Sequence, residues 1–593
     1  MPAARPDDSR LDHSRLDHSR LNPAARERAL HSLRTEHLDV LVVGGGIVGI
    51  GSAFDAATRG LSVGLVEARD WASGTSSRSS KLVHGGIRYL EQLNFSLVRE
   101  ALTERSLLLR TIAPHLVTPI KFLYPVQHKW WERAYIGAGM MLYDALSYVG
   151  GRWPGVPHHR HLSQRQVKLA SPSIDTNKII GGLSYFDGHV DDARYAVTLV
   201  RSAVAAGAHA ANRTSVVKFL KDGDRVVGAR VRDLETGDEF DIRARTVLNA
   251  TGVWTGETQK MVGETGHVKV RASKGVHIVV PRSAFKSTMG LLLRTEKSVL
   301  FVIPWNRHWI IGTTDTDWNL DLDEPAATSN DIEYILGHVN SVLSIPISRD
   351  QIQGVFAGLR PLIASDDTAS TAKLSREHVV AHAGPGLVLI AGGKWTTYRV
   401  MARDAIDTIA EQLVVDTGRP VPASTTESLP LIGARGFDAA WMRRARVAKT
   451  AGISLAHMEL LLRRYGTEVE HLIELIEAEP ALAQPLPGAR EHLAVEAVFA
   501  ASHESVQHLE DVLVRRMRIS FESADRGTSA APVVADLISP ILGWNASRRN
   551  AEVESYLSRV AAERASNELP DDESAERARL SAPESGIPGL VVS

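Results

Sequence analysis

The stretch DVLVVGGGIVGIGSAFDAATRGLSVGLVEA (residues 39–68) decides the fold of this 593-residue chain. Its apolar runs at 39–43 and 62–66 predict two buried strands, and the segment between them predicts a helix. A strand, a helix and a second strand in this order are the unit from which parallel sheets are built. We therefore expect an α/β fold whose sheet begins near residue 39.

A G-x-G-x-x-G signature stands between the first strand and the helix, formed by Gly44, Gly45, Gly46, Ile47 and Gly49. Glycines in this turn let a pyrophosphate approach the positive N-terminus of the helix. Glu67 follows Gly49 by 18 residues, at the end of the second strand, where a carboxylate can accept hydrogen bonds from ribose hydroxyls. The pattern predicts a dinucleotide site but does not choose between FAD and NAD.

Two later segments favour FAD. TVLNATGVWT (246–255) and GLVLIAGGKWTTYR (386–399) each predict a strand followed by a glycine turn. A chain that returns twice to its nucleotide domain suits a long cofactor, because distant segments must hold its isoalloxazine.

Composition excludes several classes of function. The chain has a formal net charge of −1, so no overall field favours nucleic acid as a partner. It has no cysteine, which excludes disulfides and thiolate metal sites. DTDWNL (315–320) resembles the start of a calcium loop, but Leu320 stands where glycine is required, so we expect no metal. The most apolar stretch, 135–151, is too short to span a membrane and carries Asp144.

Several motifs together resemble one flavoprotein family. GGGIVGIG, TSSRSSKLVHGGIRYLEQ, ATGVW, KGVHIVVPR, IGTTDTD, GLRPL and GGKWTTYR occur in the order seen in FAD-dependent glycerol-3-phosphate dehydrogenases. These quinone-linked enzymes belong to the D-amino-acid-oxidase-like superfamily. The resemblance is close over 39–401 and looser in the region that follows.

The resemblance and the periodicity together imply a domain plan. A Rossmann-type FAD-binding domain is expected to be interleaved with a mainly antiparallel-sheet substrate domain, and a C-terminal all-α domain follows. The expected bounds are a disordered arm over 1–36, the α/β body over 37–415 with substrate parts at 120–190 and 270–355, a linker over 416–430, the helical domain over 431–562 and a flexible tail over 563–593.

The resemblance also implies FAD as the cofactor and names the residues that would hold it. Glu67 would bind the ribose, and the segment 75–82 would line the pyrophosphate and the flavin. The complete expected set is Gly44, Gly45, Gly46, Ile47, Gly49, Glu67, Ala68, Thr75, Ser76, Ser77, Ser79, Ser80, Lys81, Leu82, Gly85, Gly86, Val217, Thr251, Gly252, Trp254, Gly393 and Thr396. His84, in the same segment, is either a turn residue or a flavin contact.

The implied reaction is the oxidation of sn-glycerol 3-phosphate to dihydroxyacetone phosphate, with electrons passed to a membrane quinone. The expected catalytic group is His277, Arg360 and Lys394, and the expected substrate-binding group is Arg88, Tyr89 and Arg376. Guanidinium forks supplemented by ammonium and hydroxyl donors suit a phosphate dianion. A histidine can take the hydroxyl proton near neutral pH, and an arginine can stabilise the developing carbonyl oxygen.

Two other functions are consistent with the same residues. One is an oxidase that hands its electrons to O₂, acting on glycerol phosphate or on a hydroxy acid or amine. The other, of a different class, is a FAD-binding sensor without turnover. We expect a cytoplasmic protein that associates peripherally with the inner face of the cell membrane through an apolar or aromatic patch. Trp130 and Trp131 could belong to such a patch, although core packing is the favoured interpretation. The helical domain would either cover the flavin domain or support a homodimer.

Overall fold

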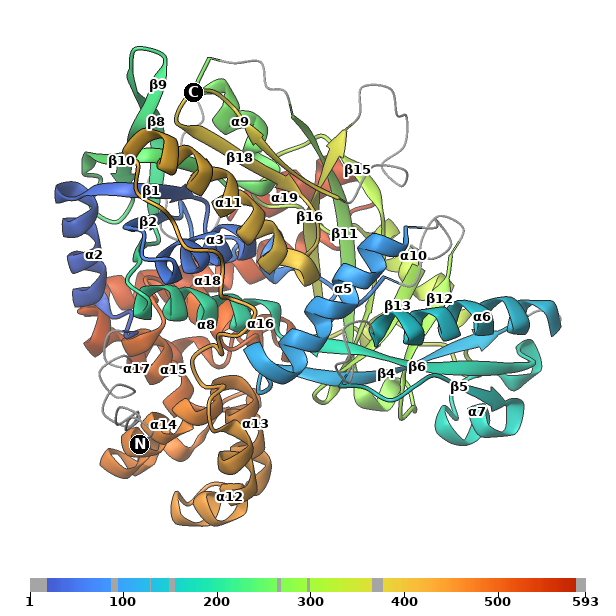
Figure 1. Ribbon diagram of the computed structural model, residues 1–593. Helices are drawn as coiled ribbons and strands as arrows, with labels where there is room; N and C mark the ends of the chain where they lie inside the picture. Colours follow the sequence, from blue (N-terminus) through green and yellow to red (C-terminus); the bar gives the residue numbers. More distant parts are fainter. Residues whose placement is uncertain are drawn as a thin grey trace, which may run out of the picture.

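The computed structural model describes residues 19–86, 94–127, 130–148, 155–263, 268–295, 299–364 and 377–582 (Figure 1). Two large sheets form the body, and a mostly helical region built from the C-terminal part of the chain lies against them. The expected fold class, an α/β body followed by a C-terminal helical domain, is confirmed.

The first sheet has the order β17-β18-β10-β1-β2-β7. β1 pairs in parallel with both β10 and β2, and β10 pairs in parallel with β18. Parallel strands covered on both faces are apolar throughout, and every residue of β1 after His37 is buried. The strands are β1 (His37–Val43), β2 (Val63–Val66), β7 (His209–Ala211), β8 (Thr214–Asp222), β9 (Arg225–Asp233), β10 (Glu239–Asn249), β17 (His378–His382) and β18 (Leu387–Gly392).

The second sheet has the order β15-β11-β14-β13-β12-β4-β6-β3, with β16 beside β11 and β5 beside β6. Its pairs are antiparallel except for the pair of β12 with β4. A Cβ on Gly392 would lie 2.6 Å from Ile363, so the ends of β18 and β16 bring the two sheets together. The strands are β3 (Leu82–Val83), β4 (Val117–Val126), β5 (Arg160–Ser163), β6 (Gly181–Val190), β11 (Lys269–Pro281), β12 (Gly290–Arg294), β13 (Val299–Trp305), β14 (His308–Gly312), β15 (Thr316–Trp318) and β16 (Gly354–Ala364).

Helices cover both sheets. α3 packs between α8 and α11 against the parallel sheet, and the three share one apolar core with β1 and β2. α10 packs on β11, β13 and β14 of the second sheet. The helices of the body are α2 (Pro23–Thr35), α3 (Ile47–Thr58), α5 (Phe95–Leu107), α6 (Trp130–Ser147), α7 (Gln164–Ala170), α8 (Asp192–Ala205), α9 (Thr255–Lys260), α10 (Ser329–Asn340) and α11 (Tyr398–Thr417).

The N-terminal arm is not wholly disordered as expected. Helix α2 begins at Pro23, and the side chain of Asn22 accepts a hydrogen bond from Ala25 N. Leu30 and Leu33 are buried in the core that β1 also lines. Residues 1–18 lie outside the described residues.

The C-terminal region differs from the expected all-α domain in two ways. It includes a β-hairpin, β19 (Pro485–Leu486) with β20 (Ala489–Leu493). The expected flexible tail contains α19, whose Arg579 donates to Glu324 of the body at 2.7 Å. The helices of this region are α12 (Phe437–Thr450), α13 (Leu455–Tyr465), α14 (Val469–Ala478), α15 (Ala494–His503), α16 (Ile519–Glu522), α17 (Ala531–Leu542), α18 (Ala546–Ser566) and α19 (Asp572–Leu580).

Helix α6 corrects the interpretation of Trp131 as a core residue. Its side chain is 54% exposed, whereas Met140 and Tyr143 of the same helix are buried. Within the described residues, no helix is both long enough and apolar enough to cross a membrane.

Candidate functional site

The glycine loop between β1 and α3 has no room for side chains at three positions. Gly44 has a φ of +112°, and a Cβ there would lie 2.7 Å from the carbonyl oxygen of Ala250. A Cβ on Gly45 would lie 2.6 Å from the ring of Trp71. A Cβ on Gly49 would lie 1.9 Å from the carbonyl oxygen of Gly44, so helix and strand can only pack this closely with glycine.

Glu67 closes the loop from the end of β2. Its Oε2 accepts a hydrogen bond from Gly45 N at 2.6 Å, and its Oε1 accepts one from Arg69 N at 2.8 Å. Burial raises the pKa of Glu67, and these two N–H groups act in the opposite direction. Each carboxylate oxygen has a second lone pair, so the group can still accept hydrogen bonds from a ribose.

The N-terminus of α3 is suited to a pyrophosphate. Its N-cap is Gly46, which has no side chain with which to cap the helix. Ile47 N donates to Ser76 Oγ at 2.9 Å, and a Cβ on Gly46 would approach that oxygen to 3.2 Å. Backbone N–H groups and the helix dipole at such an end favour an anion, so these residues fit the pyrophosphate of FAD.

The two later glycine turns lie at the same edge of the sheet. β10 runs parallel to β1, and β18 runs parallel to β10, so Thr251, Gly252 and Gly393 follow strand ends at the same edge of the sheet as Gly44. Gly252 and Gly393 have φ values of +60° and +75°, which favour glycine. The expectation that distant segments return to the nucleotide loop is confirmed.

Three other expected cofactor residues lie around this edge. Ala68 follows Glu67 directly and is half-buried. Trp254 donates from Nε1 to Asp323 at 2.9 Å, and the guanidinium of Arg69 lies 4.5 Å from its ring centre. The β8–β9 register steps from Val216 to Lys218, so Val217 is a bulged residue whose backbone is free of that ladder.

Hydrogen bonds to remote parts of the chain, here called the brace, hold the segment 75–82 in place. Thr75 Oγ1 donates to Leu359 O at 2.6 Å, and Ser79 donates through both its N and its Oγ to Asp192. Leu82 is buried in β3. Lys81 corrects the expectation of a cofactor ligand, because its ammonium is fully buried and donates to Asp192 at 2.9 Å. Its backbone is also engaged, because Lys81 N donates to Ser79 Oγ at 3.0 Å and Lys81 O accepts from Val190 N at 3.0 Å.

A residue of the C-terminal region completes this brace. Arg518 donates to Asp191 at 2.8 Å, to Asp192, and to Ser77 O at 3.3 Å. The sequence interpretation left open whether this region covers the flavin domain or supports a homodimer. The structure places it directly against the cofactor segment.

The Gly85–Gly86 pair has a packing role. A Cβ on Gly85 would lie 2.5 Å from Leu102 and 2.6 Å from Tyr143 Oη. The missing side chain therefore makes room for α5 and α6, and Gly86 has a φ of +70°. His84 N donates to Thr396 Oγ1 at 3.2 Å, which joins this turn to the segment after β18.

His277 lies on β11, opposite Gly312 of β14 and Phe356 of β16. Its Nε2 is 2.9 Å from Ser80 Oγ, and its ring stacks on Phe356 at 4.8 Å. Its Nδ1 is buried without a hydrogen-bond partner among the described residues. Burial, helped by the charges of Lys81 and Arg360, holds the pKa of His277 well below its ordinary value. The imidazole is therefore neutral at pH 7 and can accept a proton.

Arg360 extends from β16 and is held from several sides. Its Nη2 donates to Thr313 Oγ1 at 2.8 Å and to Thr314 O at 3.0 Å. Its Nη1 lies 3.4 Å from both Ser273 Oγ and Asp315 Oδ1. A Cβ on Gly275 would lie 2.4 Å from Nη2, so this glycine makes room for the guanidinium.

The remaining expected residues divide into two groups. Lys394 and Thr396 follow β18, where Lys394 is half-buried and Thr396 is buried. Arg88, Tyr89 and Arg376 lie outside the described residues. The structure thus brings together the glycine loop, the 75–82 segment and His277, with Arg360 close enough to affect the pKa of that histidine.

Sequence reasoning missed the residues that hold these groups in place. Thr313, Thr314 and Asp315 belong to the motif IGTTDTD, so a signal was present without an assigned role. Phe356 and Asp192 carried no recognisable signal, because their partners are remote in sequence.

Comparisons with known proteins identify the family of this chain. A model of the family "FAD dependent oxidoreductase" matches residues 39–399, more than half of the chain, and a model of the "C-terminal domain of alpha-glycerophosphate oxidase" matches 424–549. Glycerol-3-phosphate dehydrogenase 2 of Mycobacterium tuberculosis is 52% identical over 95% of this chain and 94% of its own length. The mitochondrial glycerol-3-phosphate dehydrogenase of Bos taurus is 34% identical over 90% of this chain and 74% of its own length.

A solved structure is also similar. The glycerol-3-phosphate dehydrogenase of Bacillus halodurans, complexed with FAD, has a TM-score of 0.73 at 28% identity, covering 91% of this chain and 98% of that one. The family match and these relatives, together with the glycine loop, show that the chain belongs to the FAD dependent oxidoreductase family and, within it, to the glycerol-3-phosphate dehydrogenases.

Proposed function

We propose that this enzyme oxidises sn-glycerol 3-phosphate to dihydroxyacetone phosphate and passes the electrons to a membrane quinone. The substrate is inferred from the names of the relatives, above all from the Mycobacterium tuberculosis enzyme that matches nearly the whole chain. FAD is the cofactor of the family, and when bound it supplies N5 as the acceptor for the hydride from C2 of the substrate.

The observation that carries this proposal is the neutral, buried His277. If its Nε2–H is donated to Ser80 Oγ, Nδ1 carries the lone pair of the ring and has no hydrogen-bond donor among the described residues. The depressed pKa keeps this nitrogen unprotonated at neutral pH. A positioned base of this kind contributes about 10²–10⁴-fold to the rate of a reaction.

Arg360 supports the same step through its charge. Its guanidinium is kept in one orientation by Thr313 and Thr314, and the charge favours alkoxide character as the hydroxyl proton leaves. We assign the phosphate to Arg88, Tyr89 and Arg376, with Lys394 as a further cation on the segment after β18.

The test is an anaerobic titration of the FAD-loaded enzyme with sn-glycerol 3-phosphate, followed by the absorbance of the flavin. We expect the flavin band to bleach, and glycerol, which lacks the phosphate, to leave it unchanged. A flavin that stays oxidised with sn-glycerol 3-phosphate but bleaches with another alcohol or an amine would refute the substrate. A flavin that no substrate bleaches would favour a sensor.

The electron acceptor has one specific competitor. The C-terminal region matches a domain named after alpha-glycerophosphate oxidase, so O₂ is the alternative acceptor. A soluble quinone should reoxidise the bleached enzyme rapidly under anaerobic conditions. Rapid formation of peroxide in air would instead assign the enzyme to the oxidases.

Peripheral association with the inner face of the membrane is supported by helix α6. Its exposed positions recur at helical spacing and are all apolar: Trp131, Ala134, Tyr135, Ala138, Met141, Leu142 and Ala145. Trp131, Tyr135 and Met141 are 54%, 56% and 61% exposed. An exposed apolar stripe with interfacial aromatics favours burial at a lipid surface.

Flotation of the enzyme with anionic lipid vesicles tests this surface. Met141→Ser should reduce the fraction that floats, whereas Met442→Ser, at an 80% exposed methionine on α12, should not. If the floating fraction falls equally in both variants, or falls in neither, α6 is not the membrane contact.

A further inference from the structure

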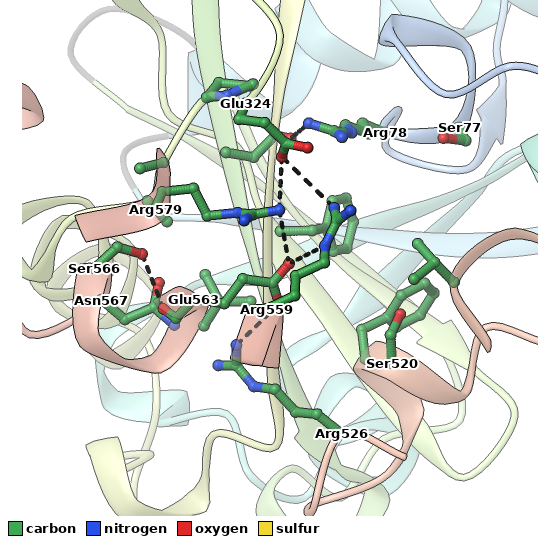
Figure 2. Close-up of a pocket in the computed structure, with 18 of the residues that line it drawn as sticks. Ser77, Arg78, Glu324, Ser520, Arg526, Arg559, Glu563, Ser566, Asn567 and Arg579 are labelled. Carbon is green, nitrogen blue, oxygen red and sulfur yellow. Dashed lines mark hydrogen bonds and ion pairs between the residues drawn. The ribbon is translucent and has the colours of Figure 1, made fainter. Parts of the chain in front are cut away.

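A cavity lies between the body and the C-terminal helices (Figure 2). It encloses about 750 Å³, counting the solvent at its mouth. Its walls come from Ser77 and Arg78, residues 324–327, residues 355–357 of β16, and the segments around α16, α18 and α19. Neither His277, Arg360 nor Lys394 lines it, so it is separate from the proposed catalytic group.

The lining contains more arginines than carboxylates. Two carboxylates, Glu324 and Glu563, face six arginines. The arginines are Arg78, Arg515, Arg518, Arg526, Arg559 and Arg579. Ser77, Ser520, Ser566 and Asn567 add hydroxyl and amide groups to the same walls.

Two of these arginines form ion pairs with carboxylates that lie outside the cavity. Arg515 forms an ion pair with Asp511 at 2.7 Å, and Arg518 forms one with Asp191 at 2.8 Å. Neither carboxylate lines the cavity. The charge of these two arginines is therefore compensated without a ligand.

Three others share the two lining carboxylates. Glu563 lies 3.5 Å from Arg526, 3.4 Å from Arg559 and 3.7 Å from Arg579. Figure 2 marks these contacts with dashed lines. Arg579 also contacts Glu324 at 2.7 Å, and Arg559 contacts Glu510 behind the wall. Glu563 is thus divided among three guanidinium groups.

Arg526 is the least compensated of the three. It is only 7% exposed, and its guanidinium has one polar contact among the described residues, the 3.5 Å contact with Glu563. Burial lowers the pKa of Arg526, and Glu563 only partly opposes this effect. A buried cation needs close hydrogen-bonded counter-charge, and here the cavity is where that counter-charge can enter.

We propose that this cavity binds a small phosphate monoester, with Arg526 as its principal ligand and Arg559 and Arg579 beside it. A phosphate dianion suits guanidinium forks flanked by hydroxyl and amide donors.

The cavity is placed to influence catalysis, a link that rests on the proposed function. Phe356 lines the cavity and stacks on His277 with an interplanar angle of 12°. Ser77, another lining residue, belongs to the segment that holds the cofactor loop. A ligand in the cavity would therefore restrict the movement of Phe356, which contacts His277, and of the segment that contains Ser77.

Calorimetric binding to the FAD-loaded enzyme tests the site without relying on turnover. The probe is glycerol 2-phosphate, a monoester with no free C2 hydroxyl, and inorganic phosphate is titrated in parallel. We expect Arg526→Gln to weaken binding of the monoester by at least about ten-fold, the scale of one charge-assisted hydrogen bond. Arg549→Gln, at a half-exposed arginine of α18 paired with Asp536, should leave it unchanged.

A third variant separates this site from the catalytic cleft. Arg360→Gln should retain the binding that Arg526→Gln loses. The opposite result would place the ester in the catalytic cleft and overturn this proposal, while leaving the proposed function intact. Wild-type affinity in Arg526→Gln, or binding of inorganic phosphate without the monoester, would also overturn it.

Ser520→Glu is a second variant that tests the cavity even if Arg526→Gln fails to fold. The new carboxylate would stand in the cavity in place of the ligand, so the variant should have a higher Tm than the wild type without ligand. Glycerol 2-phosphate should raise the Tm of the wild type and not that of Ser520→Glu. A rise that persists in this variant would exclude the cavity as the binding site.

Discussion

Gly275→Ala is the sharpest test of how Arg360 is positioned. The added methyl group would lie 2.4 Å from Nη2 of Arg360 and 2.7 Å from Oγ1 of Thr313. Both atoms take part in the hydrogen bond that orients the guanidinium, so neither can move without breaking it. β11 is paired with β16 at Gly275 and with β15 at the preceding Lys274, which limits how far the backbone can retreat.

The size of the effect follows from this crowding. Nη2 must move by about 1 Å to reach an ordinary contact distance from the new carbon. That movement stretches the 2.8 Å bond to Thr313 and the 3.0 Å bond to Thr314 beyond hydrogen-bonding range. A misplacement of about 1 Å in a catalytic group costs about 100-fold in rate, or about 2.7 kcal/mol.

The assay is kcat/KM for sn-glycerol 3-phosphate with a soluble quinone, beside the FAD content and Tm of each variant. Gly275→Ala should bind FAD normally and lose about 100-fold in kcat/KM. The matched control is Gly337→Ala, where a Cβ meets nothing within 4 Å. Wild-type kcat/KM in folded, FAD-loaded Gly275→Ala would refute the role of Arg360, whereas loss of FAD would mean that the glycine serves the fold.

Three further predictions follow from other parts of the site. His277→Gln should lower kcat far more than it changes KM, because a base acts in the transition state. In the wild type, the acid limb of the pH profile of kcat/KM should lie below pH 6.5, because the pKa of His277 is depressed. Gly49→Ala should yield protein without bound FAD, measured by flavin absorbance, because its Cβ would overlap a loop oxygen at 1.9 Å. Burial lowers the pKa of His508, but hydrogen bonds to Glu235 and Glu552 reverse this and raise it to about 9. The resulting stability, about 3 kcal/mol, should be complete below pH 6.5 and lost as the pH rises through 9, and denaturation of His508→Gln should lack this dependence.

The cofactor loop was predictable because its chemistry is local. Three glycines, a helix start and Glu67 occupy fewer than thirty consecutive residues, and each is required by the backbone it belongs to. The two later turns were also predictable, since a parallel strand that ends in glycine must end at the same edge of the sheet. Helix α2 was missed because its apolar side consists largely of Leu30 and Leu33 within a charged segment.

The brace beneath the cofactor segment could not be predicted, because it joins residues that are remote in the chain. Asp192 is 111 residues from Lys81, and Arg518 is 326 residues from Asp192. A lysine beside serines in a cofactor motif is interpreted as a cofactor ligand. Only the fold shows that its ammonium group forms an ion pair with a carboxylate of α8. Pairing at such distances leaves no periodic or spacing signal in a single sequence.

This brace gives the C-terminal region a role that its helical pattern does not suggest. Arg518 and Lys81 share the buried carboxylate of Asp192, so removal of either cation leaves a buried charge poorly compensated, at a cost of about 3–5 kcal/mol. The same arginine donates to Ser77 O, one residue from the serine that receives Ile47 N at the start of α3. The cofactor loop is therefore supported through a continuous set of hydrogen bonds that ends in the C-terminal region. A protein lacking that region should lose the order of the 75–82 segment, and with it FAD, even though every residue of the glycine loop is present.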